Sequence, residues 1–185
     1  MTVPLDKSVI CPVLIGRTRE LAALNSLIDV ARSGQGHAAL ISGEAGIGKS
    51  RLVAEAKSAV LAQGYLLLQG ACFQADTSYP YAPLLDLLRA FFASRLAAPL
   101  ASDQELLMRE LARLLPDLAL LFPQPGPLPL PQTLEPEQQK RRLFIVLTHF
   151  FASQAAQQPV LLIVEDLHWC DESSLDFCCT WLDTL

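Results

Sequence analysis

One short segment constrains this chain more than any other feature: Gly43-Glu44-Ala45-Gly46-Ile47-Gly48-Lys49-Ser50. It satisfies the pattern G-x-x-x-x-G-K-[ST] and lies between a short apolar run, His37–Ser42, and a segment of helical periodicity, Lys49–Gln63. Glycines let a backbone wrap with its N–H groups turned inward, and a helix start adds unpaired N–H groups and a positive dipole end. The sequence therefore predicts a phosphate-binding loop between a strand and a helix.

Two side chains of this loop have expected roles in binding a nucleotide. Lys49 is long enough to reach the β and γ phosphates, and the Ser50 hydroxyl is a suitable ligand for Mg²⁺. The alternative is a chance match in a glycine-rich turn. The predicted strand before the loop and helix after it favour the phosphate-binding interpretation.

A second candidate site follows the apolar run Val160–Val164, which ends in the carboxylates Glu165 and Asp166. Carboxylates at the carboxyl end of a parallel strand lie at the crevice where open α/β sheets bind ligands. One can hold Mg²⁺ directly or through water, and the other can orient or deprotonate an attacking water. Many buried strands end in Asp or Glu, so this pattern alone is weak support for a metal site. Together with the phosphate loop it is strong support.

Periodicity divides the rest of the chain into alternating helices and strands. Helical spacing is found over residues 17–32 and 49–63, after Pro83, after the capping-box residue Ser102, from Pro136 to Pro159, and after the capping residue Asp171. Tyr65–Gln69 and Val160–Val164 are apolar runs typical of strands buried in a parallel sheet. This order predicts a three-layer α/β fold with a parallel sheet. We expect an extension over residues 1–12 and one domain over 13–185, with a helical insertion at about 83–122 and a proline-rich loop at 123–136.

Composition narrows the expected partners and location. The formal net charge of −5 gives no reason to expect broad attraction to nucleic acid or anionic lipid. No apolar run reaches the ~20 residues that a membrane-spanning helix needs. The five cysteines form an odd set without a C-x-x-C pair, and no signal peptide precedes them. We therefore expect reduced cysteines, a cytoplasmic location and no membrane partner.

Several segments resemble a known family. They are Val13-Leu14-Ile15-Gly16-Arg17-Thr18-Arg19-Glu20-Leu21, Gly43–Leu52, Gly70-Ala71-Cys72, Tyr79–Leu84, Arg142-Leu143-Phe144, and Glu165–Asp171 with Ser174-Leu175. Together they resemble the P-loop signal-transduction ATPases of the STAND type, close to the AAA+ class, and most of all the ATPase module of large LuxR-type transcriptional regulators. The resemblance implies a P-loop NTPase fold and a module that binds ATP or ADP with Mg²⁺ and switches conformation with nucleotide state.

The same resemblance implies a set of site residues. Adenine would lie near Ile15, Gly16 and Arg17. The phosphates would be held by Gly43, Glu44, Ala45, Gly46, Ile47, Gly48, Lys49, Ser50 and Arg51. Mg²⁺ would be held by Ser50, Glu165 and Asp166, and catalysis would involve Lys49, Glu165 and Asp166. The first carboxylate is more often Asp in P-loop proteins, so Glu165 and Asp166 are not assigned separate roles.

Family domains of this kind continue beyond the motif that contains Glu165 and Asp166. The chain is therefore expected to be an N-terminal fragment whose fold is incomplete at its C-terminal end. DNA contact would then come only through a missing C-terminal domain. ATP turnover would be slow, because no candidate cation follows the carboxylates. The strand Val160–Val164 would lie between His37–Ser42 and Tyr65–Gln69, with one bare flank that promotes self-association.

Two alternative functions remain open at this stage. In the first, the chain is a non-catalytic interaction module whose leucine-rich helices between Pro83 and Leu121 dock a partner, with nucleotide only stabilising the fold. In the second, it is a kinase for a small molecule, which would need an acceptor site and an arginine-rich lid that the sequence does not display. Dependence of ATP turnover on Glu165 and Asp166 separates the first alternative from an ATPase.

Overall fold

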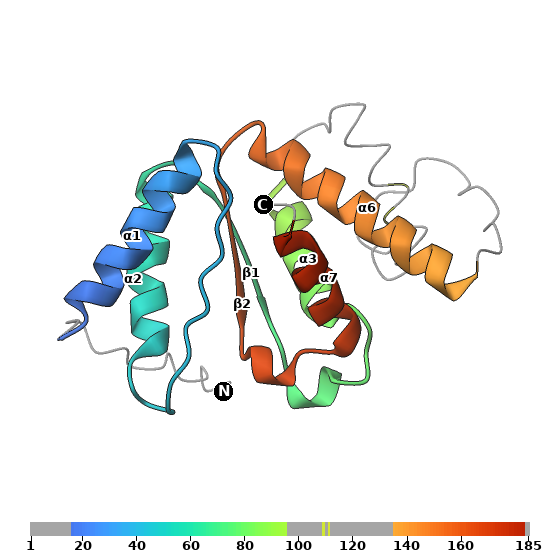
Figure 1. Ribbon diagram of the computed structural model, residues 1–185, viewed down its shortest axis with the longest axis horizontal. Helices are drawn as coiled ribbons and strands as arrows, with labels where there is room; N and C mark the ends of the chain where they lie inside the picture. Colours follow the sequence, from blue (N-terminus) through green and yellow to red (C-terminus); the bar gives the residue numbers. More distant parts are fainter. Residues whose placement is uncertain (1–15, 96–108, 110, 112–134, 184–185) are drawn as a thin grey trace, which may run out of the picture. The chain divides into compact units, whose positions relative to one another are not determined.

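The computed structural model describes residues 16–95, 109, 111 and 135–183. The chain divides after Gly64 into two compact units. Figure 1 shows the elements of each unit, which we describe separately. The first unit contains α1 (Thr18–Arg32) and α2 (Lys49–Ala62), which pack against each other. The contact buries Ile28 on α1 and, at four-residue spacing, Leu52, Ala56 and Val60 on α2. Both predicted helices are confirmed.

The predicted strand over residues 37–42 is wrong. The structure has no strand there, and the side chain of Leu40 is 80% exposed. A strand exists only when a neighbouring strand completes its hydrogen-bond ladder, and the described residues supply no such neighbour. Two of the six residues are alanines, which are depleted in strands. The apolar residues of this run predicted a buried strand, but the segment is not buried in the structure.

The second unit is built on a parallel pair of strands, β1 (Leu66–Ala71) and β2 (Val160–Glu165). Leu66 lies opposite Val160, and Ala71 lies opposite Glu165. The ladder is extended by the N–H of Cys72, which donates to the carbonyl of Glu165 at 2.9 Å. The predicted pairing of these two runs is confirmed, and among the described residues the sheet has these two strands.

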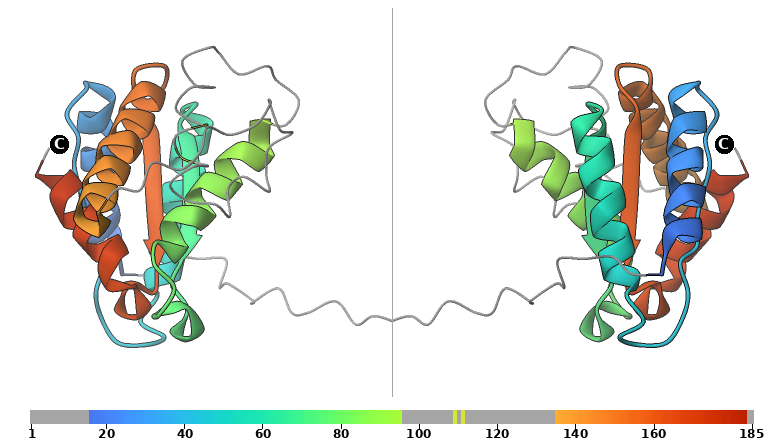
Figure 2. Two further views of the ribbon diagram at one scale, coloured as in Figure 1. Left: turned by 90° about the vertical axis from the view of Figure 1, so that its right-hand side faces the viewer. Right: turned by 90° about the vertical axis from the view of Figure 1, so that its left-hand side faces the viewer.

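Three helices cover one face of this sheet: α3 (Ala82–Arg95), α6 (Pro136–Ala155) and α7 (Glu172–Leu182) (Figure 2). Their shared core is rich in phenylalanine, with Phe91 and Phe150 in edge-to-face contact at a centroid distance of 4.9 Å. The apolar residues that recur at helical spacing after Pro83 are all buried on α3: Leu84, Leu87, Leu88, Phe91 and Phe92. The short 3₁₀ turns η1 (Gln74–Asp76) and η2 (Leu167–Trp169) follow the two strands.

Two predicted segments lie outside the described part of the chain, apart from single residues. They are the helix opened at Ser102 and the proline-rich loop at 123–136. Within the described ranges, no helix combines the length and the apolar character that crossing a membrane requires.

Asp171 joins the start of α7 to the start of α3. Its Oδ1 accepts the N–H of Ser174 at 2.9 Å, as predicted for a helix cap, and also the N–H of Tyr81 at 3.1 Å. Tyr81 has a φ of 65°, which is unusual for a residue with a side chain. One buried carboxylate, 5% exposed, thus fixes both helix starts.

We predict that Asp171→Ala lowers the free energy of unfolding by about 1–3 kcal/mol, because the helix loses its cap and the N–H of Tyr81 loses its acceptor. Asp171→Asn is the matched control, since its amide oxygen still accepts both hydrogen bonds. Urea denaturation measures both. Equal losses in the two variants would contradict this role of Oδ1.

Cys72 is the most protected of the described cysteines, which are all free thiols. Its side chain is 2% exposed, and burial raises its pKa to about 12. A thiol with this pKa carries almost no thiolate at pH 8. Among the four described cysteines, we therefore expect iodoacetamide at pH 8 to alkylate the exposed Cys179 first and Cys72 only after unfolding, as mass spectrometry of timed samples can follow. Early labelling of Cys72 would contradict its buried position.

Candidate functional site

The phosphate loop has the backbone that its glycines predict. Gly43, Gly46 and Gly48 have φ angles of 147°, 80° and 96°, values that side-chain-bearing residues rarely adopt. Gly48 immediately precedes α2, whose first N–H groups have no partner within the helix. No acidic residue lies in the first turn of α2. The loop therefore leads into an uncompensated positive helix end, the arrangement that binds anions.

Lys49 closes this loop. Its Nζ donates to the carbonyl oxygens of Gly43 and Glu44, both at 2.9 Å. A turn supports the same segment, since the N–H of Ile47 donates to the carbonyl of Glu44 at 3.5 Å. The ammonium group of Lys49 is thus held at the start of the loop by two carbonyl oxygens, and these hydrogen bonds are exposed to solvent. A positive charge held there is ready to meet a phosphate.

The remaining phosphate-loop residues differ in what they contact. Ser50 is the second residue of α2, the position expected for a metal-ligating hydroxyl. Arg51 forms an ion pair with Glu55 one turn further along the same helix. That ion pair makes Arg51 at least partly a structural residue of α2.

The adenine residues implied by the resemblance are only partly described. Ile15 lies outside the described residues, and Gly16 has a φ of 74° just before α1. Arg17 reaches the phosphate loop, where its Nη2 donates to the carbonyl of Ile47 at 3.0 Å. Its Nη1 also binds Glu20 Oε1 at 2.7 Å, and this hydrogen bond lowers the pKa of Glu20. The structure thus brings Arg17 together with the loop.

The carboxylate pair Glu165 and Asp166 lies where β2 ends. Glu165 Oε1 accepts a hydrogen bond from Gln69 Nε2 at 3.0 Å, which orients the carboxylate from the neighbouring strand. Asp166 has a φ of 54°, so the chain turns sharply there, and its carbonyl accepts the N–H of Trp169 at 2.9 Å. The two carboxylates therefore sit on different backbone geometries, one extended and one left-handed.

Gln69 is a site residue that sequence reasoning missed. It is a polar residue within the otherwise apolar strand Leu66–Ala71. It pairs with Ile163 across the ladder, and Glu165 lies two residues further along β2, on the same face of the sheet. Period-two alternation combined with the correct register would have found it.

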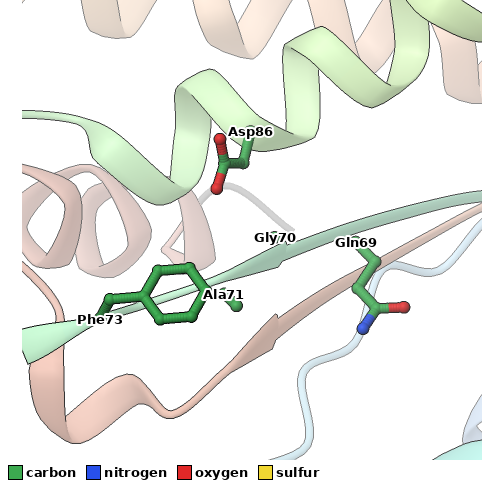
Figure 3. A pocket seen from close by; sticks show the side chains of 5 residues that line it. All are labelled: Gln69, Gly70, Ala71, Phe73 and Asp86. Carbon is green, nitrogen blue, oxygen red and sulfur yellow. The ribbon is translucent and has the colours of Figure 1, made fainter. Parts of the chain in front are cut away.

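An open hollow of about 380 Å³ lies beside this end of the sheet. It is lined by Gln69, Gly70, Ala71, Phe73 and Asp86. Figure 3 shows Asp86 directed from α3 toward β1, with Phe73 in the segment that follows the strand. Gln69 is common to the hollow and to the hydrogen bond with Glu165, but neither Glu165 nor Asp166 lines the hollow.

The predicted metal donors have suitable chemistry for Mg²⁺. The Ser50 hydroxyl and the carboxylates of Glu165 and Asp166 are hard oxygen ligands. Among the described residues, no group of three or more His, Cys, Asp or Glu side chains is placed to hold a metal ion.

Comparison with known proteins identifies the family of this chain. Residues 13–185 match the family model described as AAA ATPase domain. An uncharacterized protein of Rhizobium meliloti (strain 1021) is 29% identical over 169 residues, which cover 88% of this chain and 16% of that protein. The chain thus spans about one sixth of the length of this relative. No solved structure matches the chain significantly.

The family match covers the phosphate loop, both strands and the carboxylate pair, and it agrees with the α/β elements and parallel strands that the structure displays. The predicted α/β P-loop fold is therefore confirmed. With a match over nearly its whole length, the chain belongs to the family of AAA ATPase domains.

Proposed function

We propose that this chain binds ATP or ADP with Mg²⁺ through the loop Gly43–Ser50. The observation that carries the proposal is the preformed loop itself, in which Lys49 is already held across the carbonyls of Gly43 and Glu44 at the start of α2. A site that is organised before its ligand arrives loses little free energy in ordering itself on binding. The family match supports the same ligand class.

We also propose that Glu165 and Asp166 act on the bound nucleotide. The Gln69 amide holds the Glu165 carboxylate at the end of β2, where an oriented base can position an attacking water. Ser50, Glu165 and Asp166 would supply oxygen ligands to Mg²⁺, which when bound would neutralise charge on the phosphates. Hydrolysis at this site would proceed by positioning and charge stabilisation.

The biological role that we propose is a nucleotide-dependent switch in a transcriptional regulator. Contacts to a γ-phosphate bias neighbouring elements between two arrangements, and hydrolysis releases the bias. In the second unit, the turn after β2 leads directly to Asp171, which is hydrogen-bonded to the start of α3. The role in transcription rests on the resemblance to the ATPase module of LuxR-type regulators.

A phosphate-release assay tests the carboxylates, with binding of Mg-ATP measured in parallel. We expect Glu165→Gln and Asp166→Asn to bind nucleotide but to lower turnover by a factor of about 10²–10⁴, the usual contribution of a positioned acid or base. Asp86→Asn is a matched control. It also removes a carboxylate, but that carboxylate lies on α3, where it forms an ion pair with Arg89. Unchanged turnover in both carboxylate variants would contradict their proposed role.

A further inference from the structure

Arg17 contacts the phosphate loop from 30 residues earlier in the chain. Its side chain is 29% exposed and is held at two points, by the carbonyl of Ile47 at 3.0 Å and by Glu20 Oε1 at 2.7 Å. Its own carbonyl accepts the N–H of Leu21 at 3.0 Å, so its backbone is fixed at the start of α1. The guanidinium is therefore anchored between a helix and the loop.

The group that Arg17 holds is the peptide joining Ile47 to Gly48. A trans peptide is planar, and its C=O and N–H groups point to opposite sides. This plane can turn about the N–Cα bond of Gly48, whose φ of 96° is one that glycine adopts freely. Holding the Ile47 carbonyl on one side therefore fixes the Gly48 N–H on the other.

Two cations, Lys49 and Arg17, bind carbonyls at different ends of the loop. Lys49 binds the carbonyls of Gly43 and Glu44 near its beginning, and Arg17 binds the carbonyl of Ile47 near its end. Carbonyl oxygens repel an anion, while N–H groups attract it. Cations that occupy the carbonyls leave the N–H groups to face a phosphate.

We infer that Arg17 is a positioning residue for the phosphate loop, which holds the Ile47–Gly48 peptide so that the Gly48 N–H meets a phosphate. This inference rests on the proposed nucleotide binding and deepens it. The resemblance implies that Arg17 lies near the adenine, and the two roles differ in a measurable way. A residue that acts through the loop affects every phosphate ligand, with or without a base.

Calorimetric titration of the full chain with Mg-ATP and with magnesium tripolyphosphate, which has no base, tests this role. We expect Arg17→Ala to weaken both ligands about tenfold, close to the value of one hydrogen bond to a charged group. Arg19→Ala is the matched control, because it removes the same charge from the same helix turn. It should change both affinities less than about twofold, since surface charges contribute little.

Three outcomes would overturn the inference. Loss of Mg-ATP affinity with tripolyphosphate binding unchanged would place Arg17 at the base, and equal losses in the Arg17→Ala and Arg19→Ala variants would indicate general charge attraction. Unchanged affinity in Arg17→Ala would show that the contact does not matter. If Arg17→Ala does not fold, Arg17→Lys keeps the charge but not the two-pronged donor, and it should weaken both ligands by the same smaller factor.

A measurement without ligand separates this inference from the proposed function. In ¹H–¹⁵N spectra of the free chain, the Gly48 amide resonance should shift in Arg17→Ala and stay in place in Arg19→Ala, because only the first variant frees the Ile47 carbonyl. A wild-type chain that binds neither ligand would contradict the proposed nucleotide binding. An unmoved Gly48 resonance would contradict the positioning role itself.

Discussion

Replacing Lys49 by alanine is expected to weaken Mg-ATP binding by about 1.5–3 kcal/mol, the range for a hydrogen bond to a charged group, which corresponds to roughly 10- to 150-fold in Kd. Two effects act in the same direction. The variant loses the cation that meets the phosphates, and the carbonyls of Gly43 and Glu44 lose the donor that holds them at 2.9 Å. The loop is then both less positive and less ordered.

Isothermal titration calorimetry measures this loss directly. Lys57→Ala is the matched control, since it removes the same charge from the same helix two turns further on. We expect its affinity for Mg-ATP to stay within about twofold of the wild type, because a charge two helix turns away from the loop is largely screened. Equal affinity of the wild type and Lys49→Ala would exclude this loop as the phosphate site.

Gly70→Ala is expected to lower the free energy of unfolding by about 1–3 kcal/mol, as overpacking of a tight contact does. A Cβ at Gly70 would lie 2.6 Å from the carbonyl oxygen of Pro83 and 3.3 Å from Leu87 Cγ. The first of these atoms belongs to the backbone at the start of α3, so α3 must move away from β1. The small gain from a stiffer unfolded chain does not offset that movement.

Urea denaturation of Gly70→Ala and of the double variant with Leu87→Ala separates the two contacts. Removing the Leu87 side chain should not restore stability, because the closer obstacle is the Pro83 carbonyl and the change also empties a buried position. A single variant as stable as the wild type would show that α3 does not pack on β1 as closely as the structure has it.

Local patterns in the sequence predicted those parts of the fold that local physics decides. The loop glycines and the cap at Asp171 have the predicted backbone. These features depend on neighbours within a few residues, so a short window of sequence contains the necessary information. The pairing of β1 with β2 was also expected, although that expectation came from the family resemblance and not from either run alone.

Contacts between distant parts of the chain were not predictable in the same way. The bond from Gln69 to Glu165 spans 96 residues, and the bond from Arg17 to Ile47 spans 30. The first pair follows only once the strand register is known, and no sequence pattern marks Arg17 and Ile47 as partners. The strand expected over residues 37–42 failed for the same reason, since an apolar run becomes a strand only if another segment completes its ladder.

Hydrogen exchange followed by mass spectrometry tests the central claim most directly, because it reports where on the chain Mg-ATP acts. The account predicts that saturating Mg-ATP slows amide exchange in peptides covering Gly43–Leu52, where the loop and the first turn of α2 would bind phosphate. The same addition to Lys49→Ala, at the same concentration, should slow exchange there far less. Wild-type exchange over Gly43–Leu52 that is the same with and without saturating Mg-ATP would contradict the assignment of this loop as the nucleotide site.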